Sequence, residues 1–402
     1  MSERKIKFLV LLTVFIDIIG LGIVIPVLPF YVQKFSGSPL TITSLFAVFA
    51  ICSFLSSPLI GGLSDKYGRR PAFLVSIAST AIGWFIFASA HSVWVLYLGR
   101  IIDGLAAGNL PVAQSSLVDI AKNDRDRTAN LGLIGAVFGV GFIIGPFIGG
   151  ALGHISHNLP FWFVGFLATL NFIGAYFFLP ETRKITSSNT KSHFSFNPFT
   201  PIIRSIKDKL LRPNYLALFL FGLAIAGTQS MFSLYLNRVF GYREFVTGLI
   251  FATMGVIIAI NQIFVMRKFW LKKFKEPTLE LIMLLVFCIG YLMLSIPFRL
   301  FLIIGLLMIT FGQSVLRVVM NGQLIAKSSP NRRGEILGIS ASIISLAAGI
   351  SPFAAGALFN WKVYAPFLMG SFFLLCAFFV LFKVRQGLEF NLSPKDPIIS
   401  EV

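Results

Sequence analysis

Three charged residues lie inside apolar stretches of the sequence: two acids that could bind and release protons, and an arginine that could pair with them. Asp17 stands among isoleucines ahead of Gly20 and Gly22, and Arg100 and Asp103 are three residues apart, which places them on one helix face. Burying such a charge at the centre of a membrane helix costs about 2.5 to 3.5 kcal/mol, so the charges that persist there are functional by default. We therefore expect Asp17, Asp103 and Arg100 to serve in proton coupling. The alternative is a structural role, with each charge satisfied by neighbouring groups.

A polar loop follows the second apolar stretch and combines glycines, an acid and two arginines. Glycine permits a tight backbone turn, and the carboxylate of Asp65 can form charge-assisted bonds that hold adjacent helices together. We expect a conformational latch that includes Gly61, Asp65, Gly68, Arg69 and Arg70. A merely basic loop is the alternative, but it has no need of an acid and glycines at these spacings.

A string of glycines forms the third motif. Small residues four positions apart allow two helices to approach backbone to backbone, and a proline within the string removes one helix hydrogen bond and bends the segment. The members are Gly135, Gly139, Gly141, Gly145, Pro146, Gly149 and Gly150. Ordinary tight packing explains one or two of these glycines but not the whole string.

The elements that must position these residues are membrane-spanning helices. Of the 402 residues, 56% are hydrophobic and 12% are charged, whereas about a quarter of the residues of a soluble domain are charged. A helix needs about 20 apolar residues to cross a hydrocarbon core of about 30 Å. We predict an all-α membrane protein with spans at 6 to 32, 41 to 62, 71 to 91, 94 to 120, 128 to 153, 160 to 180, 214 to 237, 245 to 267, 277 to 297, 300 to 326, 334 to 359 and 364 to 384.

The basic residues are distributed unequally about these spans. The net charge is +18, and with a cytoplasmic N-terminus 27 of the 34 Lys and Arg lie on the cytoplasmic side and five on the other. This is the positive-inside bias of membrane proteins. We therefore expect a multi-pass protein of the inner membrane with both termini in the cytoplasm. Because membrane topology explains the positive charge, we expect no nucleic-acid partner.

The sequence also contains an internal repeat. Seven identical residues recur at an offset of 206, among them Pro146 with Pro352 and Arg127 with Arg333. This shift places the fifth span on the eleventh, as a duplicated six-helix unit requires; chance similarity between two glycine-rich helices is the alternative. We predict an N-terminal bundle over 1–180, a linker over 181–213, a C-terminal bundle over 214–385 and a cytoplasmic tail over 386–402.

The linker is polar and basic, and its segment 194–212 predicts a helix that lies on the membrane surface. Ile202, Ile206 and Leu210 recur four residues apart, while Lys207 and other basic residues take the opposite side. We expect anionic lipid headgroups as the partner of this segment. No loop is long enough to hold a soluble catalytic domain, so we do not expect an enzyme.

The polar loop from Gly61 to Arg70 resembles the signature loop of the major facilitator superfamily, and the glycine string resembles the motif of its antiporters. The first span, with Asp17 followed by glycines and a Pro-x-x-Pro, is similar to that of twelve-helix drug:proton antiporters of the tetracycline-exporter type. This resemblance is closest up to Arg183. It implies a major facilitator fold with two pseudo-symmetric six-helix bundles, an acidic partner for the loop at Asp119, and a latch that holds the outward-facing state.

The second half departs from this pattern. The loop from Arg267 to Lys275 lacks the acid and the glycines, and we expect no intramembrane acid in the ninth span, where tetracycline exporters carry one used in coupling. Arg317 in the tenth span has no obvious acid nearby and could meet an anionic group of a substrate; snorkelling or structural pairing is the alternative. The expected substrate-binding residues are Gln229, Gln262, Gln313, Arg317 and Asn321.

Together these features predict a proton-coupled antiporter that exports an amphipathic small molecule or drug by alternating access. The alternatives are an exporter of an endogenous metabolite such as a siderophore, a nutrient importer, and a membrane sensor that transports nothing. Protons are the expected coupling ion, with no other cofactor, and the protein is expected to be a monomer. His154 and His157 lie in a predicted loop without a third ligand, so we expect them to be solvated and expect no metal site.

Overall fold

The computed structural model describes residues 3–35, 38–122, 124–183, 199–327 and 333–391, and every regular element in these ranges is a helix. The helices of the first half are α1 (Glu3–Gln33), α2 (Pro39–Tyr67), α3 (Arg69–Ala88), α4 (Val93–Leu105), α5 (Asn109–Asp119), α6 (Asp124–Ile155) and α7 (Leu159–Phe178). Those that follow are α8 (Thr200–Lys207), α9 (Arg212–Phe240), α10 (Glu244–Ile260), the π-helix η1 (Asn261–Trp270), α11 (Leu271–Lys273), α12 (Glu276–Leu294), α13 (Arg299–Ala326), α14 (Arg333–Trp361) and α15 (Ala365–Asn391).

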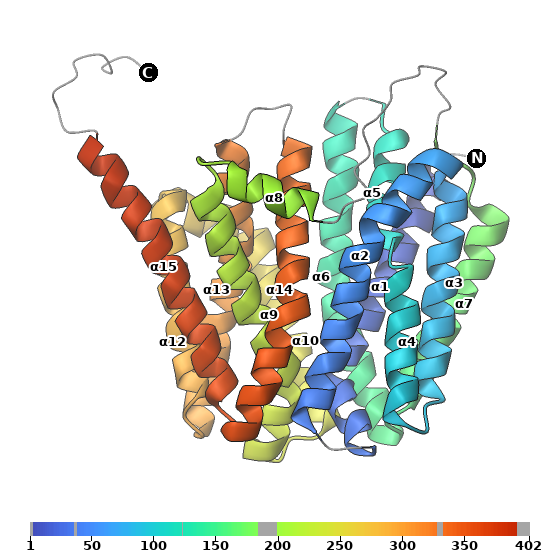
Figure 1. Ribbon diagram of the computed structural model, residues 1–402, viewed down its shortest axis with the longest axis horizontal. Coiled ribbons are helices and arrows are strands. Elements are labelled where there is room, and N and C mark those ends of the chain that lie inside the picture. The colour runs from blue at the N-terminus through green and yellow to red at the C-terminus, as the bar shows by residue number, and fades with distance from the viewer. Residues whose placement is uncertain (1–2, 36–37, 123, 184–198, 328–332, 392–402) are drawn as a thin grey trace.

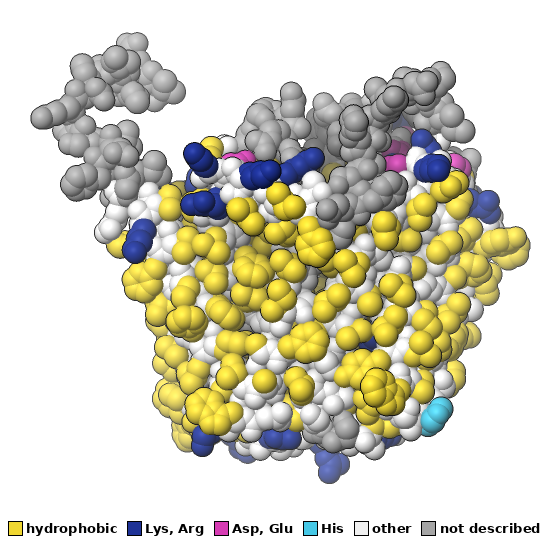
Figure 2. Space-filling view, in the orientation of Figure 1, with side chains coloured by type: hydrophobic (Ala, Val, Ile, Leu, Met, Phe, Trp, Pro, Cys, Tyr) yellow, Lys and Arg dark blue, Asp and Glu magenta, His cyan; other side chains and the backbone are white. Residues whose placement is uncertain are grey.

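Eleven stretches of helix within the described ranges are long and apolar enough to cross a membrane. The helix α9, for example, has 29 residues, which at 1.5 Å per residue exceeds a hydrocarbon core of about 30 Å. Figure 2 shows a broad band of hydrophobic side chains between two rims that carry Lys and Arg. Lipid tails cannot solvate charge, so this surface fits a bilayer and confirms the prediction of an all-α membrane protein.

The twelfth crossing is discontinuous, whereas the sequence predicted a continuous fourth span. It consists of α4 and α5, with a break at residues 106–108. Serines of α2 satisfy carbonyl groups near the break: Ser56 Oγ donates to the Gly104 carbonyl at 2.7 Å, and Ser57 Oγ donates to the Ala107 carbonyl at 3.1 Å. Backbone irregularity is tolerated inside a membrane protein where other helices supply such partners.

The crossings form two bundles that lie side by side, the N-terminal bundle of α1–α7 and the C-terminal bundle of α9–α15 (Figure 1). α1 begins and α15 ends at the same end of the molecule, which we call the terminal end. The bundles pack against each other mainly through α6 with α10 and through α2 with α14. These pairs join crossing five to eight and crossing eleven to two, so the two interfaces are equivalent under the internal repeat.

The interface between α6 and α10 is closed only at the end opposite the termini. Gly139, Ile143 and Gly150 share one face of α6 because they are four and seven residues apart. A Cβ on Gly150 would lie 2.8 Å from the Glu244 carbonyl oxygen of α10, and Ile143 approaches Gly255 of the same helix. Gly139, one turn nearer the terminal end, has nothing within 4 Å of its Cβ position.

The contact between α14 and α2 also loosens toward the terminal end. Gly338, Gly349 and Gly356 lie on one face of α14, and the last two approach Ile51 and Leu40 of α2. Gly338, which is nearest the terminal end, has nothing within 4 Å of its Cβ position. The two bundles are therefore in contact at the end opposite the termini and separated toward the terminal end.

Two boundaries differ from the predicted ones. The helix α8 covers Thr200–Lys207 and is shorter than the surface helix predicted at 194–212, whose first residues lie outside the described ranges. The helix α15 extends to Asn391, so the segment predicted as a tail at 386–402 begins as helix. The sequence of this segment contains no helix-terminating proline before Pro394.

Candidate functional site

A polar cluster lies at the break between α4 and α5, with Arg100, Asp103 and Asn109 buried and Asp17 partly buried. Asp17 of α1 forms a side-chain hydrogen bond with Asn109, the first residue of α5. Asp103, in the last turns of α4, is close enough to Asp17 for their charges to interact, and it forms a side-chain hydrogen bond with Thr80 of α3. The fold thus brings together the two acids that the sequence singled out. Asn109 and Thr80, which the sequence did not point to, are added by tertiary contact.

Arg100 completes this cluster. Its Nη1 lies 3.6 Å from Asp103 Oδ2, and the residue is only 3% exposed. Its guanidinium carbon lies 4.2 Å from the ring centre of Trp84 and 4.5 Å from that of Phe87, so the faces of two aromatic rings stabilise the positive charge. Within the described part of the chain, Arg100 Nε has no hydrogen-bond partner. The guanidinium is held by ring faces and one loose ion pair, an arrangement in which it can shift.

Close helix crossings fix the position of these side chains. A Cβ on Gly83 of α3 would lie 2.8 Å from the Cβ of Asp103, and a Cβ on Gly99 of α4 would lie 2.8 Å from the Gly83 carbonyl oxygen. The two helices are therefore in backbone contact beside Arg100. Larger residues at these glycines would push α4 away from the aromatic rings that hold the guanidinium.

Two acids and one base share this cluster, which has consequences for proton binding. With all three groups charged, the cluster carries a net negative charge, and interior charges interact strongly because the effective dielectric constant is low. A proton on Asp103 would weaken its attraction for Arg100, and a proton on Asp17 would change its hydrogen bond with Asn109. The arrangement can therefore convert the binding of a proton into a change of side-chain contacts.

A second group of charges lies at the terminal end of the N-terminal bundle. Arg69, the first residue of α3, donates from Nη1 to Asp65 at 2.6 Å and from Nε to Asp119 at 2.9 Å. It also donates to Ser64 Oγ at 2.7 Å. One guanidinium thus connects α2, α3 and α5. Arg70, which was predicted to share the latch, instead donates to a backbone carbonyl of α7.

Glu181 caps α3 beside this triad, and the sequence analysis missed it. Its carboxylate accepts hydrogen bonds from the backbone N–H groups of Arg69 at 2.8 Å and Arg70 at 3.1 Å, where the free amides and dipole of a helix N-terminus favour an anion. Gly68 has φ of 109°, a conformation that favours glycine, and a Cβ there would collide with the Glu181 carboxylate. Arg183 extends the contact by donating to the Lys66 carbonyl at 2.9 Å. The sequence did offer one signal for Glu181, namely an acidic residue directly after the sixth predicted span.

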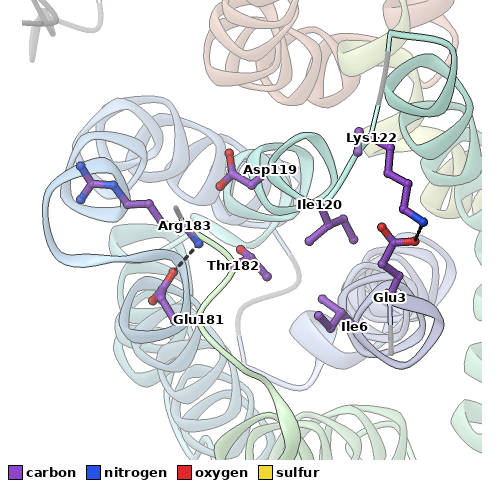
Figure 3. Close-up of a pocket in the computed structure, with 9 residues that line it drawn as sticks. Glu3, Ile6, Asp119, Ile120, Lys122, Glu181, Thr182 and Arg183 are labelled. Carbon is purple, nitrogen blue, oxygen red and sulfur yellow. Dashed lines mark hydrogen bonds and ion pairs between the residues drawn. The ribbon is translucent and has the colours of Figure 1, made fainter. Parts of the chain in front are cut away.

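A solvent-accessible cavity of about 590 Å³ adjoins these charges at the terminal end. Figure 3 shows Asp119, Glu181 and Thr182 on one side of it, and the ion pair of Lys122 with Glu3 on the other. Asp119 and Glu181 are thus reached by water from the terminal end. The charges in the membrane interior at Arg100 and Asp103 have no contact with this cavity.

The glycine string lies on two faces of α6. Three members contact α1, namely Gly141, Gly145 and Gly149. A Cβ on Gly145 would lie 2.9 Å from the Gly22 Cα, and Gly22 in turn packs on Pro146. Gly150 faces α10 of the other bundle, while Gly135 and Gly139 have open space around their Cβ positions. Some of these glycines therefore pack within the N-terminal bundle, Gly150 packs against the other bundle, and Gly135 and Gly139 lie where the bundles are separated.

The predicted substrate-binding residues lie in three helices of the C-terminal bundle. Arg317 is exposed in α13, and Gln313 and Asn321 on the same face are partly exposed. Among the described residues Arg317 forms no ion pair. Gln229 of α9 is partly exposed and Gln262 of η1 is exposed, and no contact joins either of them to Arg317. The structure therefore assembles three of the five residues on one helix face.

The ninth span does contain a buried acid, contrary to the sequence prediction. Glu280, one turn inside α12, is 4% exposed and lies close enough to Lys327 and Glu276 to interact with them electrostatically. Gln323 donates to Glu276 at 2.9 Å, and Lys327 donates to Asn214 at 2.9 Å. Burial lowers the pKa of Lys327, and the charge of Glu280 opposes this shift. Glu280 was missed because it lies at the edge of the apolar stretch.

One of the two neighbouring histidines is not simply solvated. His157 Nε2 lies 2.6 Å from Glu244 Oε1, at the end opposite the termini. His154 instead packs its ring near Phe245, with 6.5 Å between the ring centres. The prediction of two solvated loop histidines is therefore wrong for His157, because the fold places the start of α10 beside it.

Comparison with known sequences gives a consistent picture. The family model of the Major Facilitator Superfamily matches residues 10–279. The quinolone resistance protein NorA of Staphylococcus aureus is 28% identical over 377 residues, which cover 91% of this chain and 93% of that protein. The class H tetracycline resistance protein of Pasteurella multocida is 29% identical over 370 residues, which cover 90% of each protein.

Solved structures with low sequence identity share the fold. A bacterial homologue of the human lysosomal transporter Spinster, solved in an inward-facing and unoccupied conformation, aligns with a TM-score of 0.77 at 18% identity and covers 98% of this chain and 100% of that one. The nucleoside transporter NupG aligns with a TM-score of 0.72 at 14% identity and covers 96% and 99%. At these identities the likeness concerns the fold alone.

Proposed function

The chain belongs to the Major Facilitator Superfamily, and we propose that it is a proton-coupled antiporter that exports an amphipathic small molecule across the inner membrane. As a member of this family it is a transporter and not an enzyme. Its similarity to quinolone and tetracycline resistance proteins supports a drug-like substrate. The observation that carries the proton coupling is the buried cluster of Asp17, Asp103 and Arg100 at a broken helix.

We propose that the terminal end faces the cytoplasm. The positive-inside rule supports this orientation, since 27 of the 34 Lys and Arg belong to the segments at that end and only five to the other. In this orientation the separated ends of the bundles open toward the cytoplasm, which is the state that takes up a substrate for export. The contacts of Gly150 and Gly356 then close the outer end.

The buried cluster supplies the exchange step in this proposal. A proton that arrives from outside binds Asp17 or Asp103, and the freed Arg100 or Asn109 rearranges at the break between α4 and α5. Discontinuous helices at mid-membrane are where transporters bind ions and substrates. Each proton that moves inward contributes about 2.3 kcal/mol per 100 mV of membrane potential. A purely structural ion pair of Arg100 with Asp103 is the rival interpretation.

The charge triad is proposed to act as the conformational latch. Arg69 ties the terminal-end tips of α2, α3 and α5 into one body through Asp65 and Asp119. With Glu181 on the first turn of α3, this body is rigid enough to move as a unit. Its members all belong to the N-terminal bundle and are joined in this state, which is open at the terminal end, so the triad stiffens that bundle and does not by itself hold the outward-facing state.

Arg317 favours a substrate that carries an anionic group. A guanidinium group without an acidic partner in a membrane helix calls for an anion, and Gln313 and Asn321 on the same face offer hydrogen bonds. This observation supports the second candidate, export of an anionic metabolite such as a siderophore. Gln229 and Gln262 stay candidates for further contacts with the substrate. A nutrient importer has less support because the resistance proteins are similar over most of the chain.

The helix α8 is proposed to rest on anionic lipid headgroups. Ile203 and Ile206 are exposed on it, beside Lys207 in its last turn. Apolar side chains flanked by basic ones are the pattern of a helix at the membrane interface. The contact would hold the connection between the bundles near the cytoplasmic surface.

The proposal is tested by proton movement in proteoliposomes with an acidified interior. Candidate substrates, including quinolones, tetracyclines and anionic siderophores, are added to wild type, to Asp17→Asn and to Asp208→Asn. The last variant is the matched control, because Asp208 lies outside the spans and its side-chain oxygen accepts a hydrogen bond from the Leu211 N–H, which an Asn oxygen can also accept. Substrate should elicit proton efflux in wild type and in Asp208→Asn, but not in Asp17→Asn.

Substrate uptake is measured in parallel with a labelled compound. Uptake without proton flux, equal in wild type and in Asp17→Asn, would show that the coupling mechanism is wrong and that the protein is a facilitator or importer. Loss of flux in both variants would point to general damage and count against a specific role of Asp17.

A further inference from the structure

An ion pair joins the two bundles at the end opposite the termini. His157 lies in the connection between α6 and α7, and Glu244 is the first residue of α10. The distance from His157 Nε2 to Glu244 Oε1 is 2.6 Å, and Glu244 is 5% exposed. One partner thus belongs to the N-terminal bundle and the other to the C-terminal bundle.

The pair exists only while this end is closed. A Cβ on Gly150 would lie 2.8 Å from the Glu244 carbonyl oxygen, and a Cβ on Gly153 would lie 3.4 Å from the Glu244 Cβ. The acid is therefore part of the tight crossing of α6 with α10. When the bundles part at this end, α10 moves away from α6, and His157 loses its carboxylate.

The Glu244 carboxylate lies in a region whose other charged groups are basic. Glu244 is the only acid at that end among the described residues, whereas the other charged groups there are basic. On the face drawn in Figure 2, acidic side chains are visible only at the terminal end. The basic groups of the opposite end, from every element that reaches it, are Lys34, Arg238, Arg243, Arg299 and Lys362, with His91 and His154 as further groups that can titrate.

We propose that His157 and Glu244 form a proton-binding gate, separate from the Asp17 cluster, that closes the outer end of the transporter when His157 is protonated. The proposal rests on alternating access and on the proposed orientation. It does not depend on the substrate or on Asp17 as the proton carrier. An acidic outer medium would thus drive the protein toward the state that takes up substrate from the cytoplasm.

The direction of the pH effect follows from the linkage between proton binding and the closed state. Histidine side chains ordinarily titrate near pH 6.5, within the range met at a cell surface. A protonated His157 makes a full ion pair in the closed state and loses that partner when the bundles part. Proton binding therefore favours the closed state, and the preference is lost as the pH rises. A neutral imidazole can still donate one hydrogen bond to Glu244, so the gate weakens without disappearing.

The test measures the distance across the outer end as a function of pH. Trp94 and Trp361 are exposed residues of the N-terminal and C-terminal bundles at that end. Both are replaced by cysteine for spin labels, in a protein whose native Cys52, Cys288 and Cys376 are serine. The protein also carries Asp17→Asn and Asp103→Asn, so that protonation of the interior cluster does not contribute.

In this background the ratio of closed to open populations should rise as the pH falls from 8 to 5, because a protonated His157 pairs with Glu244 only in the closed state. His157→Gln retains a hydrogen-bond donor but cannot be protonated, so the ratio should become independent of pH. Glu244→Gln should have the same effect. His154→Gln, three residues away, is the matched control and should keep the full response.

A pH response that survives His157→Gln, or one that disappears in His154→Gln, would overturn the gate. A background protein without any pH response would do the same. Because Asp17 is already replaced in all of these proteins, failure of the gate leaves the antiport test untouched, and failure of antiport leaves the gate standing.

Discussion

Replacement of Gly150 by alanine should open the outer end of the transporter. A Cβ at this position would lie 2.8 Å from the Glu244 carbonyl oxygen, 3.1 Å from the Gly248 Cα and 3.3 Å from the Phe245 Cα. All three atoms belong to the backbone of α10, so no side chain can rotate out of the way. The added methyl group can be accommodated only if α10 moves away from α6.

The size of the effect follows from the cost of overpacking. An extra methyl group in a well-packed contact costs about 1 to 3 kcal/mol. The cost arises only where α6 and α10 touch, so it falls on the state that is closed at the outer end and is relieved by opening. The ratio of closed to open states should therefore fall by about 5- to 150-fold. Gly139→Ala is the matched control on the same helix, because its Cβ position has nothing within 4 Å in this state.

The assay uses Val27, which is fully buried in α1 and lies against the Cβ position of Gly153. A single cysteine at position 27, in a protein without native cysteines, reacts with a maleimide in detergent only when the outer end opens. Gly150→Ala should increase the labelling rate at least fivefold, and Gly139→Ala should not increase it. Equal rates in all three proteins would refute the argument, since α10 would then absorb the methyl group without separation.

Three further substitutions test other parts of the structure. Arg100→Lys should leave membrane insertion intact but reduce transport more than tenfold, because a lysine does not spread a planar cation over the Trp84 and Phe87 faces. Substrate flux in proteoliposomes measures this effect. Unchanged flux would refute the role of the ring contacts. Glu181→Gln should destabilise the protein by about 1 kcal/mol through loss of the charge at the start of α3, seen as a lower midpoint of thermal unfolding in detergent; an unchanged midpoint would contradict the cap. Arg317→Gln should weaken binding of anionic substrates about tenfold or more and leave neutral substrates unaffected, and equal losses for both would argue for a structural role.

Most of the membrane-spanning helices were predictable from sequence because each carries its own signal. A run of apolar residues reports directly on its environment, and the signature loop brings Asp65 and Arg69 close together along the chain. The partner Asp119 was expected from family resemblance, and the structure places it 2.9 Å from Arg69. Local spacing therefore gave the elements and part of the charge triad.

What could not be predicted depends on contacts between distant segments. The break at residues 106–108 has a local signal in Gly108 and Pro111, but apolar length alone favoured one continuous span, and the support that Ser56 and Ser57 of α2 give to the carbonyl groups there appears only in the structure. His157 and Glu244 give no signal until α6 and α10 cross beside them. Periodicity describes one helix at a time and does not report which faces of two helices meet.

The short helix α5 connects the two charge groups of the N-terminal bundle. Asn109, at one end, bonds to Asp17, and Asp119, at the other end, bonds to Arg69. Its 11 residues form a stiff rod of about 15 Å, uncoupled from α4 by the break. A displacement of Asn109 when Asp17 binds a proton would thus be transmitted along α5 to Asp119. In the proposed mechanism, the interruption of the fourth crossing would couple a proton bound in the membrane interior to the charge triad at the terminal end.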